Sequence, residues 1–343
     1  MELFAAANRV TQRVMTEALT DRNYGVDLAL EALLELHAVT GNDSYRQHVL
    51  DIVNRRSMHC EIPVPFEKEP FASLTYALWR CTGDDAWLRG FLQESERCRR
   101  EMPVSPDGLA LHPRGEQRGG GLATVIDAMQ EFVCRLVRAG VASGDDSSIQ
   151  TAMAQWRDSR AVLRDPQTGL WSQGRGWLTE TPDALSPGAW SRGHGWLFRG
   201  LTASLRVLPP KSQAAAEFRH YLTELADAVL PLQAQDGMWH AILSRPATDS
   251  PPDTSGSAMI ATGLAESVRC GWLTGERYAS AARRTFAVLP GYVTADGIVL
   301  STSPGPGPLQ SEEDYLVPAF PPGNDHGTFA LLFAGVEDCR AHP

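Results

Sequence analysis

Residues 81–87 read CTGDDAW, and near-copies of this stretch recur as VTGNDSY at 39–45 and ASGDDSS at 142–148. In each copy the glycine suits the left-handed conformation in which many helices end. The Asn or Asp directly after it can cap the amino terminus of a following helix. A fourth, weaker copy is LTGERYA at 273–279. The repeated pattern therefore predicts pairs of helices joined by tight turns.

Apolar residues on both sides of these turns recur with the spacing of helices, and convincing strand alternation is missing. We expect about twelve helices, near residues 3–20, 25–39, 43–58, 68–81, 84–99, 123–140, 145–159, 192–208, 212–231, 257–271, 275–289 and 325–336. Twelve helices in hairpin pairs predict an all-α fold, an (α/α)6 barrel of six hairpins closed into a ring. We expect residues 1–343 to form one such barrel domain.

Composition excludes several classes of partner. The chain has 343 residues and a formal net charge of −10, with no long run of Lys or Arg, which argues against nucleic acid and anionic membrane surfaces. No run of eighteen apolar residues could span a membrane, and the amino terminus lacks the pattern of a signal peptide. The six cysteines are scattered without metal-ligand spacing, so we expect a reduced, cytoplasmic protein.

The stretch AWSRGHGWLFRG at 189–200 is unusual for a core helix because it combines two Trp, two Arg, one His and three Gly. Trp190, Arg192 and Trp196 are predicted to share one face of a helix that starts near residue 190. The helix amino terminus and Arg192 would attract an anion, and a flat indole offers a stacking surface for a sugar ring. The alternative is a helix start with core tryptophans and a solvated arginine.

Three other residues of this stretch belong to the same candidate site. Gly193 and Gly195 would let a ligand approach closely, because glycine has no side chain to exclude it. His194 flanks the aromatic and cationic residues, and we include it among the candidate substrate-binding residues.

Asp127 is the second candidate, because it lies in the apolar stretch GLATVIDAMQEFVCRL at 121–136. A carboxyl group in apolar surroundings tends to keep its proton, as a general acid at neutral pH must. The competing interpretation is structural, since Thr124 and Asp127 have the spacing of a capping box.

Several motifs together resemble the unsaturated glucuronyl and rhamnogalacturonyl hydrolases, glycoside hydrolase family 105 with its sister family 88. They occur in the expected order along most of the chain: WSRGHGW (190–196), QDGMWHAIL (235–243), DTSGSAM (253–259), GWLTGERY (271–278) and GNDHGTFALLFAG (323–335). The resemblance implies the same (α/α)6 barrel that the hairpin count predicts.

The resemblance also implies a reaction. Enzymes of these families hydrate the C4=C5 double bond of an unsaturated uronic acid, after which the sugar ring opens and the aglycone leaves. Asp127 matches the family's catalytic aspartate, although the usual Trp and Met around it are absent. Trp190, Arg192 and Trp196 match the residues that shape the sugar pocket, and Glu69, or less well Glu67, matches a second acidic position. No metal or organic cofactor is implied, and the expected partner is a small sugar substrate.

One departure from the family pattern keeps other functions open. Family members carry a His where this chain has Ser172 and Gln173, so that Gln173 or His194 would have to supply its contact with the substrate. One alternative is another sugar-active enzyme, such as an isomerase or an inverting glycosidase that uses Asp127 and Glu69 as its carboxyl pair. The other is a carbohydrate-binding relic without catalysis.

Two further histidines favour structural roles. His326 follows a predicted helix cap at Asn324 or Asp325, and His240 in MWHAIL can pack beneath a loop. Neither is among the expected catalytic residues.

Overall fold

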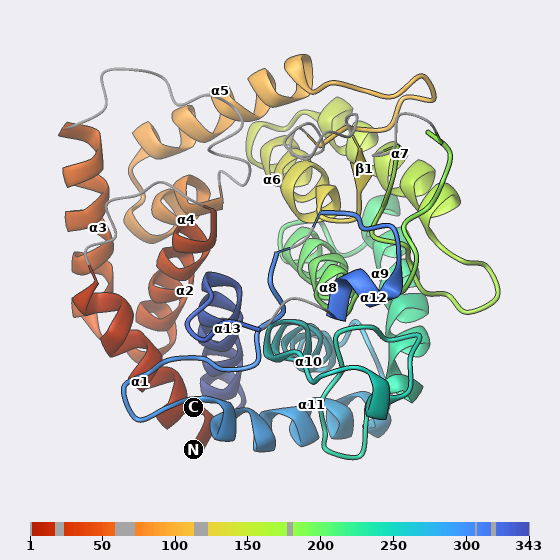
Figure 1. Cartoon of the computed structure of the whole chain (residues 1–343). Coiled ribbons are helices and arrows are strands. Elements are labelled where there is room, and N and C mark those ends of the chain that lie inside the picture. Colours follow the sequence, from red (N-terminus) through yellow and green to blue (C-terminus); the bar gives the residue numbers. More distant parts are fainter. Residues whose placement is uncertain are drawn as a thin grey trace.

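The computed structural model describes residues 2–17, 24–58, 73–112, 123–176, 181–305, 307–316 and 320–342. Six helices of these ranges form an inner ring: α2 (Tyr24–Thr40), α4 (Ser73–Thr82), α6 (Cys134–Ser143), α8 (Ser191–Leu205), α10 (Thr254–Arg269) and α13 (Asp325–Ala341). Six others lie outside them: α1 (Glu2–Thr16), α3 (Asp43–Met58), α5 (Asp85–Glu101), α7 (Asp146–Leu163), α9 (Gln213–Val229) and α11 (Glu276–Val288). Inner and outer helices alternate along the chain around a common centre (Figure 1).

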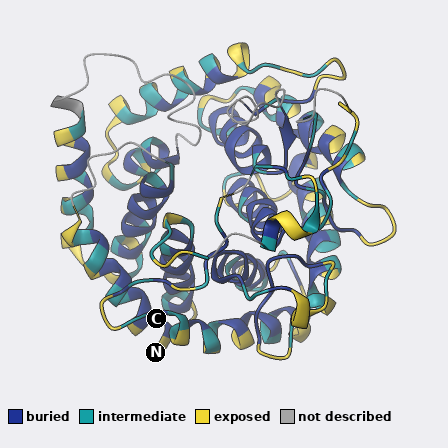
Figure 2. Ribbon diagram, in the orientation of Figure 1, coloured by how far each residue is buried: buried dark blue, intermediate teal, exposed yellow. Residues whose placement is uncertain are grey.

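A helix of the described residues corresponds to each of the twelve predicted ones, although 18–20 and 68–72 lie outside those residues and the helix predicted over 123–140 begins later. The predicted (α/α)6 barrel is confirmed. Inner helices are buried on nearly all sides, whereas outer helices bury one face and expose the other (Figure 2). In α8, for example, only Arg199 is not buried. This difference follows from position, because an inner helix packs against both its ring neighbours and the outer layer.

The turns between paired helices form as the sequence predicts. Gly41, Gly83 and Gly144 adopt φ values of 70°, 71° and 73°, in the left-handed region that glycine enters without steric cost. Asp84 then caps α5, accepting a hydrogen bond from the amide of Ala86 at 2.8 Å. Asp145 caps α7 in the same way.

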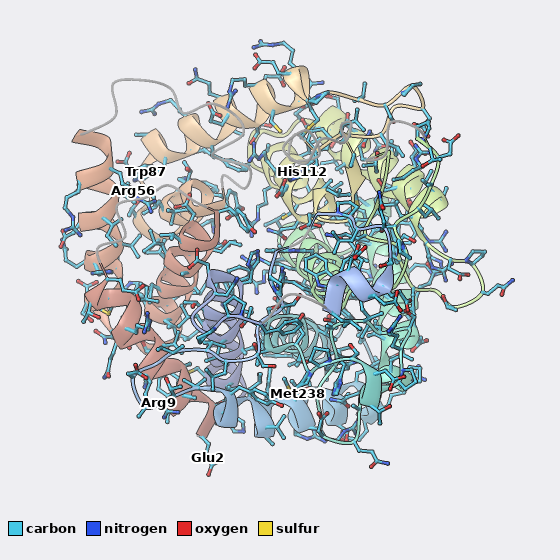
Figure 3. All side chains as sticks on the ribbon, in the orientation of Figure 1. Glu2, Arg9, Arg56, Trp87, His112 and Met238 are labelled. Carbon is cyan, nitrogen blue, oxygen red and sulfur yellow. The ribbon has the colours of Figure 1, made fainter. Side chains whose placement is uncertain are left out.

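The ring closes between the beginning and the end of the chain. Helix α1 packs against α13 and α11, and α2 packs against α13. Arg9 of α1 donates from Nε to the backbone carbonyl of Thr294 at 3.2 Å (Figure 3). This bond joins the first helix to a loop in the last fifty residues of the chain. Within the described ranges, no helix is both long and apolar enough to cross a lipid bilayer.

The prediction of one continuous helix over 123–140 is wrong. Thr124–Val125 form a short strand, β1, antiparallel to β2 (Gly174–Arg175), and a π-helix, η3 (Met129–Val133), precedes α6. The amide of Ile126 donates to the carbonyl of Gln173 at 2.9 Å, so the loop pairing competes with helix here. A further short helix, α12 (Glu312–Leu316), was not predicted.

Candidate active site

The amino termini of four inner helices gather at one end of the barrel. Tyr24 at the start of α2 hydrogen-bonds through its hydroxyl to Nε2 of His326 in the first turn of α13. Ser191 at the start of α8 donates to Asp253, the cap of α10, at 2.9 Å. Because helix amino termini carry partial positive charge, this end of the barrel favours an anionic ligand.

Arg192 lies at the centre of this convergence and is completely buried. Its Nη1 donates to Ser255 Oγ at 3.1 Å and to the carbonyl of Ser303, and its Nη2 donates to the carbonyl of Pro304 at 2.8 Å. Burial lowers the pKa of Arg192, and the nearby Asp253, Tyr24 and Asp127 oppose that shift. Arg192 therefore holds the 303–305 loop against α8 and contributes positive charge close to Asp127.

Asp253 is a structural centre that the sequence analysis did not single out. Its carboxylate accepts hydrogen bonds from Ser191 Oγ, from the amide and hydroxyl of Ser255, and from the amide of Ser303 at 3.1 Å. The side chain is fully buried, and these donors satisfy it. The Asp-Thr-Ser order in DTSGSAM was the available signal, since it is a typical helix cap.

Asp127 lies in the turn between β1 and η3 and is half-buried. Its backbone carbonyl accepts the amides of Gln130 and Glu131 at 3.0 and 3.1 Å, which starts the helical segment. The capping-box interpretation is not supported, because Thr124 lies in β1 and its Oγ1 has no hydrogen-bond partner among the described residues. π-Helical turns are frequent at functional sites, and this one begins two residues after Asp127.

The two tryptophans are buried in different surroundings. Trp190 caps α8, and its indole N–H donates to Ser303 Oγ at 3.1 Å. The ring of Trp196 lies 5.4 Å from Phe329 and 6.5 Å from His326, centroid to centroid. Trp190 packs with Ile242 and Tyr315, whereas Trp196 belongs to the core around Phe329, so the two tryptophans lie in separate apolar clusters.

His194 does not fit the substrate-binding role that the sequence suggested. It is fully buried, its Nδ1 bonds to the carbonyl of Trp190 at 2.8 Å, and its Nε2 accepts the amide of Trp171 at 3.0 Å. Burial lowers its pKa to about 4. With both ring nitrogens bonded to backbone, His194 fixes the 171–173 loop to α8 and has no atom left for a sugar.

Gln173 is 2 % exposed, and its Oε1 accepts the hydroxyl of Tyr315 at 2.6 Å. This bond joins the loop before β2 to α12. Gln173 thus lies beside Ile126 and Asp127 through its backbone, while its side chain is bonded to protein. Glu67 and Glu69 lie outside the described residues.

The glycines of α8 serve helix packing, which corrects the expectation that they admit a ligand. A Cβ at Gly193 would lie 2.9 Å from Ile126 Cδ1, and one at Gly195 would lie 2.7 Å from Met259 Cβ. One at Gly200 would lie 2.7 Å from the carbonyl oxygen of Met129. These glycines let η3 and α10 pack closely against α8.

The remaining histidines have protein partners. His326 bonds through Nδ1 to Asn324 Oδ1 at 2.7 Å, besides its bond to Tyr24, and Asn324 caps α13 as expected. His240 bonds to the carbonyl of Ser250 and to Asp236, which fits the structural role expected for it. His326 nevertheless lies nearer to the convergence of helix ends than the sequence alone suggested.

A buried contact between His112 and Glu131 lies close in the chain to Asp127. Nε2 of His112 is 2.9 Å from Oε2 of Glu131, and both residues are less than a tenth exposed (Figure 3). Because the amide of Glu131 bonds to Asp127, this pair helps to fix the turn that carries Asp127. No sequence motif pointed to it.

The model of the family described as Glycosyl Hydrolase Family 88 matches residues 5–341, almost the whole chain. The chain belongs to Glycosyl Hydrolase Family 88. The resemblance inferred from the sequence motifs is thereby confirmed at the level of the family.

The sequence of this family 88 chain is similar to those of two named hydrolases. It is 29 % identical over 189 residues to an unsaturated 3S-rhamnoglycuronyl hydrolase from Formosa agariphila, an alignment that covers 53 % of this chain and 42 % of that protein. It is 22 % identical over 289 residues to an unsaturated rhamnogalacturonyl hydrolase from Bacillus subtilis, covering 84 % of this chain and 81 % of the other. The chain thus spans less than half of the first relative and most of the second.

Solved structures confirm the fold of this family 88 chain. A possible member of glycoside hydrolase family 105 from Salmonella enterica superposes with a TM-score of 0.85 at 20 % identity, covering 99 % of this chain and 94 % of the other. An unsaturated glucuronyl hydrolase from Bacillus sp. GL1 gives a TM-score of 0.72 at 19 % identity, covering 97 % and 95 %. A glycosyl hydrolase family 88 structure from Bacteroides vulgatus gives a TM-score of 0.75 at 19 % identity, covering 99 % of this chain and 98 % of the other.

Proposed function

We propose that this chain is a hydrolase that removes a 4,5-unsaturated uronic acid from an oligosaccharide or other glycoside by hydrating the C4=C5 double bond. The observation that carries the proposal is the placement of Asp127 within electrostatic range of Arg192, directly after Ile126, which packs against α8 at Gly193. Membership in family 88 and the names of the two sequence relatives support it.

The proposed reaction follows from what these groups offer chemically. Asp127 gives a proton to C4, and its carboxylate then takes a proton from the water that adds to C5. The hemiketal formed at C5 opens to a ketone, and collapse at C1 releases the aglycone as an alcohol. One positioned carboxyl group is sufficient, because it regains the proton that it gave.

Substrate charge fits the same end of the barrel. A uronic acid carries a carboxylate, and helix amino termini together with a nearby guanidinium favour an anion there. Arg192 is fully buried and bonded to the 303–305 loop, so we assign it a positioning and electrostatic role. Trp190 and Trp196 shape the same region, and Glu69 stays a proposed second acidic group.

The alternatives from the sequence have less support. An inverting glycosidase needs two carboxyl groups roughly 6.5–9.5 Å apart. Glu69 is outside the described residues, so no observation favours pairing it with Asp127. Membership in a hydrolase family does not favour a carbohydrate-binding relic.

We further propose that the chain forms one barrel domain. From its free thiols, such as Cys98 and Cys134, we propose a reducing location such as the cytoplasm.

The test is direct hydrolysis of unsaturated disaccharides. The purified chain is incubated separately with disaccharides that end in unsaturated glucuronic or galacturonic acid and with their saturated counterparts. We expect loss of the enol-ether ultraviolet absorbance and release of the second sugar from the unsaturated set alone. Turnover of the saturated set would instead support a conventional glycosidase, and binding without product would support the relic.

A further inference from the structure

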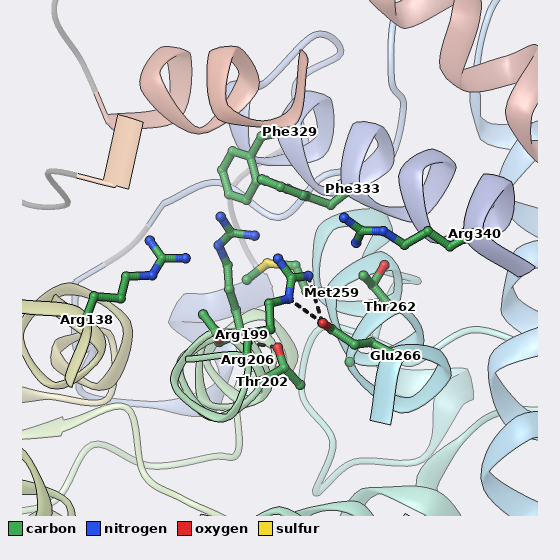
Figure 4. Close-up of a pocket in the computed structure, with 12 residues that line it drawn as sticks. Arg138, Arg199, Thr202, Arg206, Met259, Thr262, Glu266, Phe329, Phe333 and Arg340 are labelled. Carbon is green, nitrogen blue, oxygen red and sulfur yellow. Dashed lines mark hydrogen bonds and ion pairs between the residues drawn. The ribbon is translucent and has the colours of Figure 1, made fainter. Parts of the chain in front are cut away.

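A second cluster of charge lies at the opposite end of the inner ring. Four arginines line one cavity there: Arg138 of α6, Arg199 of α8, Arg206 just after α8, and Arg340 of α13 (Figure 4). Met259 and Phe329 also line it. Phe329 also packs on Trp196 and Met259 packs at Gly195, so these two side chains lie between the cavity lining and helix α8.

The carboxylates beside this cavity are fewer than the guanidinium groups. Glu31 lies 2.7 Å from Arg199 and 3.5 Å from Arg138. Glu35 and Glu266 both pair with Arg206, and Glu35 also pairs with Arg340. Among the described residues, these four guanidinium groups therefore share three carboxylates.

The ion pair of Glu337 and Arg269, next to Arg340, does not remove this excess of positive charge. Glu337 lies 3.6 Å from Arg340, but it is bonded more closely to Arg269, at 2.6 Å. Adding both residues to the set leaves the excess of one positive charge unchanged. An uncompensated charge in a buried region is costly unless an opposite charge joins it.

Arg138 is the group with the weakest partners. It is 6 % exposed and makes no hydrogen bond to any residue that the structure describes. Its nearest carboxylate oxygen is the shared one of Glu31, and its guanidinium carbon lies 4.9 Å from the ring centroid of Tyr76. Within the described residues, Nε of Arg199 and Oγ1 of Thr262 also lack hydrogen-bond partners at this cavity.

The helix dipoles explain only part of this arrangement. Cations are favoured in the last turn of a helix, where the carbonyl groups are unsatisfied. Arg206 and Arg340 occupy such positions at the ends of α8 and α13. Arg138 and Arg199 lie more than one turn before the last residues of α6 and α8, so the dipoles do not account for them.

The size of the cavity limits what can fill it. Its volume is about 30 Å³ on a scale on which one water molecule needs roughly 10–15 Å³. Arg206 and Arg340 are each more than a fifth exposed, so the cavity is reached from the carboxyl ends of the inner helices. A small ion can enter there, whereas a sugar cannot fit.

We propose that the cavity between Arg138, Arg199, Arg206 and Arg340 binds a small inorganic oxyanion such as sulfate or phosphate. The guanidinium groups of Arg138 and Arg199 donate to its oxygens, as planar forks of N–H groups do toward tetrahedral oxyanions. The bound anion balances the excess positive charge and stabilises the packing of α6, α8 and α13. This site is independent of the proposed hydrolase activity.

The test compares thermal unfolding of the wild-type chain, Arg138→Gln and the matched surface variant Arg100→Gln, whose side chain is two-thirds exposed. Sulfate is titrated at constant ionic strength, balanced with sodium gluconate, which is too large for the cavity. We expect a saturable rise in Tm for wild type and Arg100→Gln, and a flat response for Arg138→Gln. In the absence of sulfate, Arg138→Gln should melt no lower than wild type, because it removes the excess charge. Parallel rises in all three proteins would overturn the proposal, since sulfate also stabilises proteins by exclusion from their surface.

Crystals of the wild-type chain soaked in sodium selenate supply a second measurement that does not depend on the variant folding. Selenate has the shape and charge of sulfate, and its selenium scatters anomalously. We expect an anomalous peak between the guanidinium groups of Arg138 and Arg199. A cavity that holds only water after the soak would contradict the proposal.

Discussion

The guanidinium carbon of Arg192 lies 4.3 Å from the ring centroid of Trp190, the residue that caps the helix carrying them both. This contact aims the arginine toward the 303–305 loop, where it bonds to two backbone carbonyls. The side chain of Arg192 thus fixes the start of α8 to a loop more than a hundred residues away in the chain.

Replacing Arg192 tests this arrangement. Arg192→Lys keeps the positive charge but cannot reach Ser255 and both loop carbonyls at once. Since hydrogen bonds to charged groups contribute about 1.5–3 kcal/mol, we expect the free energy of unfolding to fall by about 2 kcal/mol. Urea denaturation measures it, with the exposed Arg100→Lys as control. Equal stability of the two variants would contradict the role given to Arg192.

Asp127→Asn tests the proposed acid and base. General acid–base catalysis contributes roughly 10²–10⁴ to the rate, so we expect kcat on an unsaturated uronide to fall about a thousandfold while the protein stays folded. The matched control is Asp158→Asn, an exposed position in α7. Activity retained in Asp127→Asn would remove Asp127 from the mechanism.

His194 gives a prediction about pH. Burial lowers its pKa to about 4, below the value of roughly 6.5 in an unfolded chain. Between these values the unfolded state binds the extra proton, so the stabilising contribution is complete above pH 6.5 and is lost as the pH falls toward 4. At pH 5 the loss is about 2 kcal/mol relative to pH 7.

Variants separate this effect from that of the carboxyl groups. His194→Gln should show a smaller loss of unfolding free energy between pH 7 and pH 5 than the wild-type chain. His220→Gln, whose side chain is 66 % exposed on α9, should keep the wild-type loss. Identical pH dependence in all three proteins would show that His194 is not held neutral by burial.

Gly200→Ala tests the packing of α8 against η3. The added Cβ would lie 2.7 Å from the carbonyl oxygen of Met129, and backbone cannot rotate away as a side chain can. Such overpacking costs about 1–3 kcal/mol, and we expect a loss in this range in chemical denaturation. Gly90→Ala in α5, whose Cβ would meet nothing closer than 4.0 Å, should instead stabilise the chain by up to about 1 kcal/mol. Equal effects at both positions would refute the packing argument.

Tyr24→Phe tests the contact between the first and last inner helices. The change leaves Nε2 of His326 without its hydroxyl partner, which costs about 1 kcal/mol in a half-buried position. We also expect lower kcat/KM, because the bond between Tyr24 and His326 joins the amino termini of α2 and α13 at the end of the barrel that holds the candidate site. Tyr45→Phe on α3 removes a hydroxyl away from the site and should change neither quantity. A Tyr24→Phe protein with wild-type stability would argue against the hydrogen bond.

The turns illustrate what sequence reasoning can reach. Gly83 and Asp84 act on neighbouring residues, through a left-handed dihedral and a hydrogen bond two positions away, so their effect can be deduced from the local sequence. The prediction of a helix through Asp127 failed because the structure of this segment depends on a partner about fifty residues later in the chain. Thr124–Val125 form a strand only because Gly174–Arg175 lie beside them.

The candidate site divides in the same way. Arg192 and Asp127 were identified from residue types, and in the structure their neighbours Gly193 and Ile126 pack against each other. His194 and the glycines of α8 are residue types that suit a ligand site, but they contact protein instead. His194 bonds to the amide of Trp171, and the glycines pack against Met259 and backbone. Tyr24 and Asp253 were missed because neither is unusual in its own stretch of sequence.

The sequence by itself determined most of the helices, their pairing into hairpins and the family, since each depends on local hydrogen bonding, apolar spacing or ordered motifs. Tertiary structure alone decided which buried polar groups face one another across the ring: Arg192 with Ser303, and Arg138 with Glu31. The physical reason is that burial and charge pairing depend on distances between residues far apart in the chain, which appear only when the ring closes.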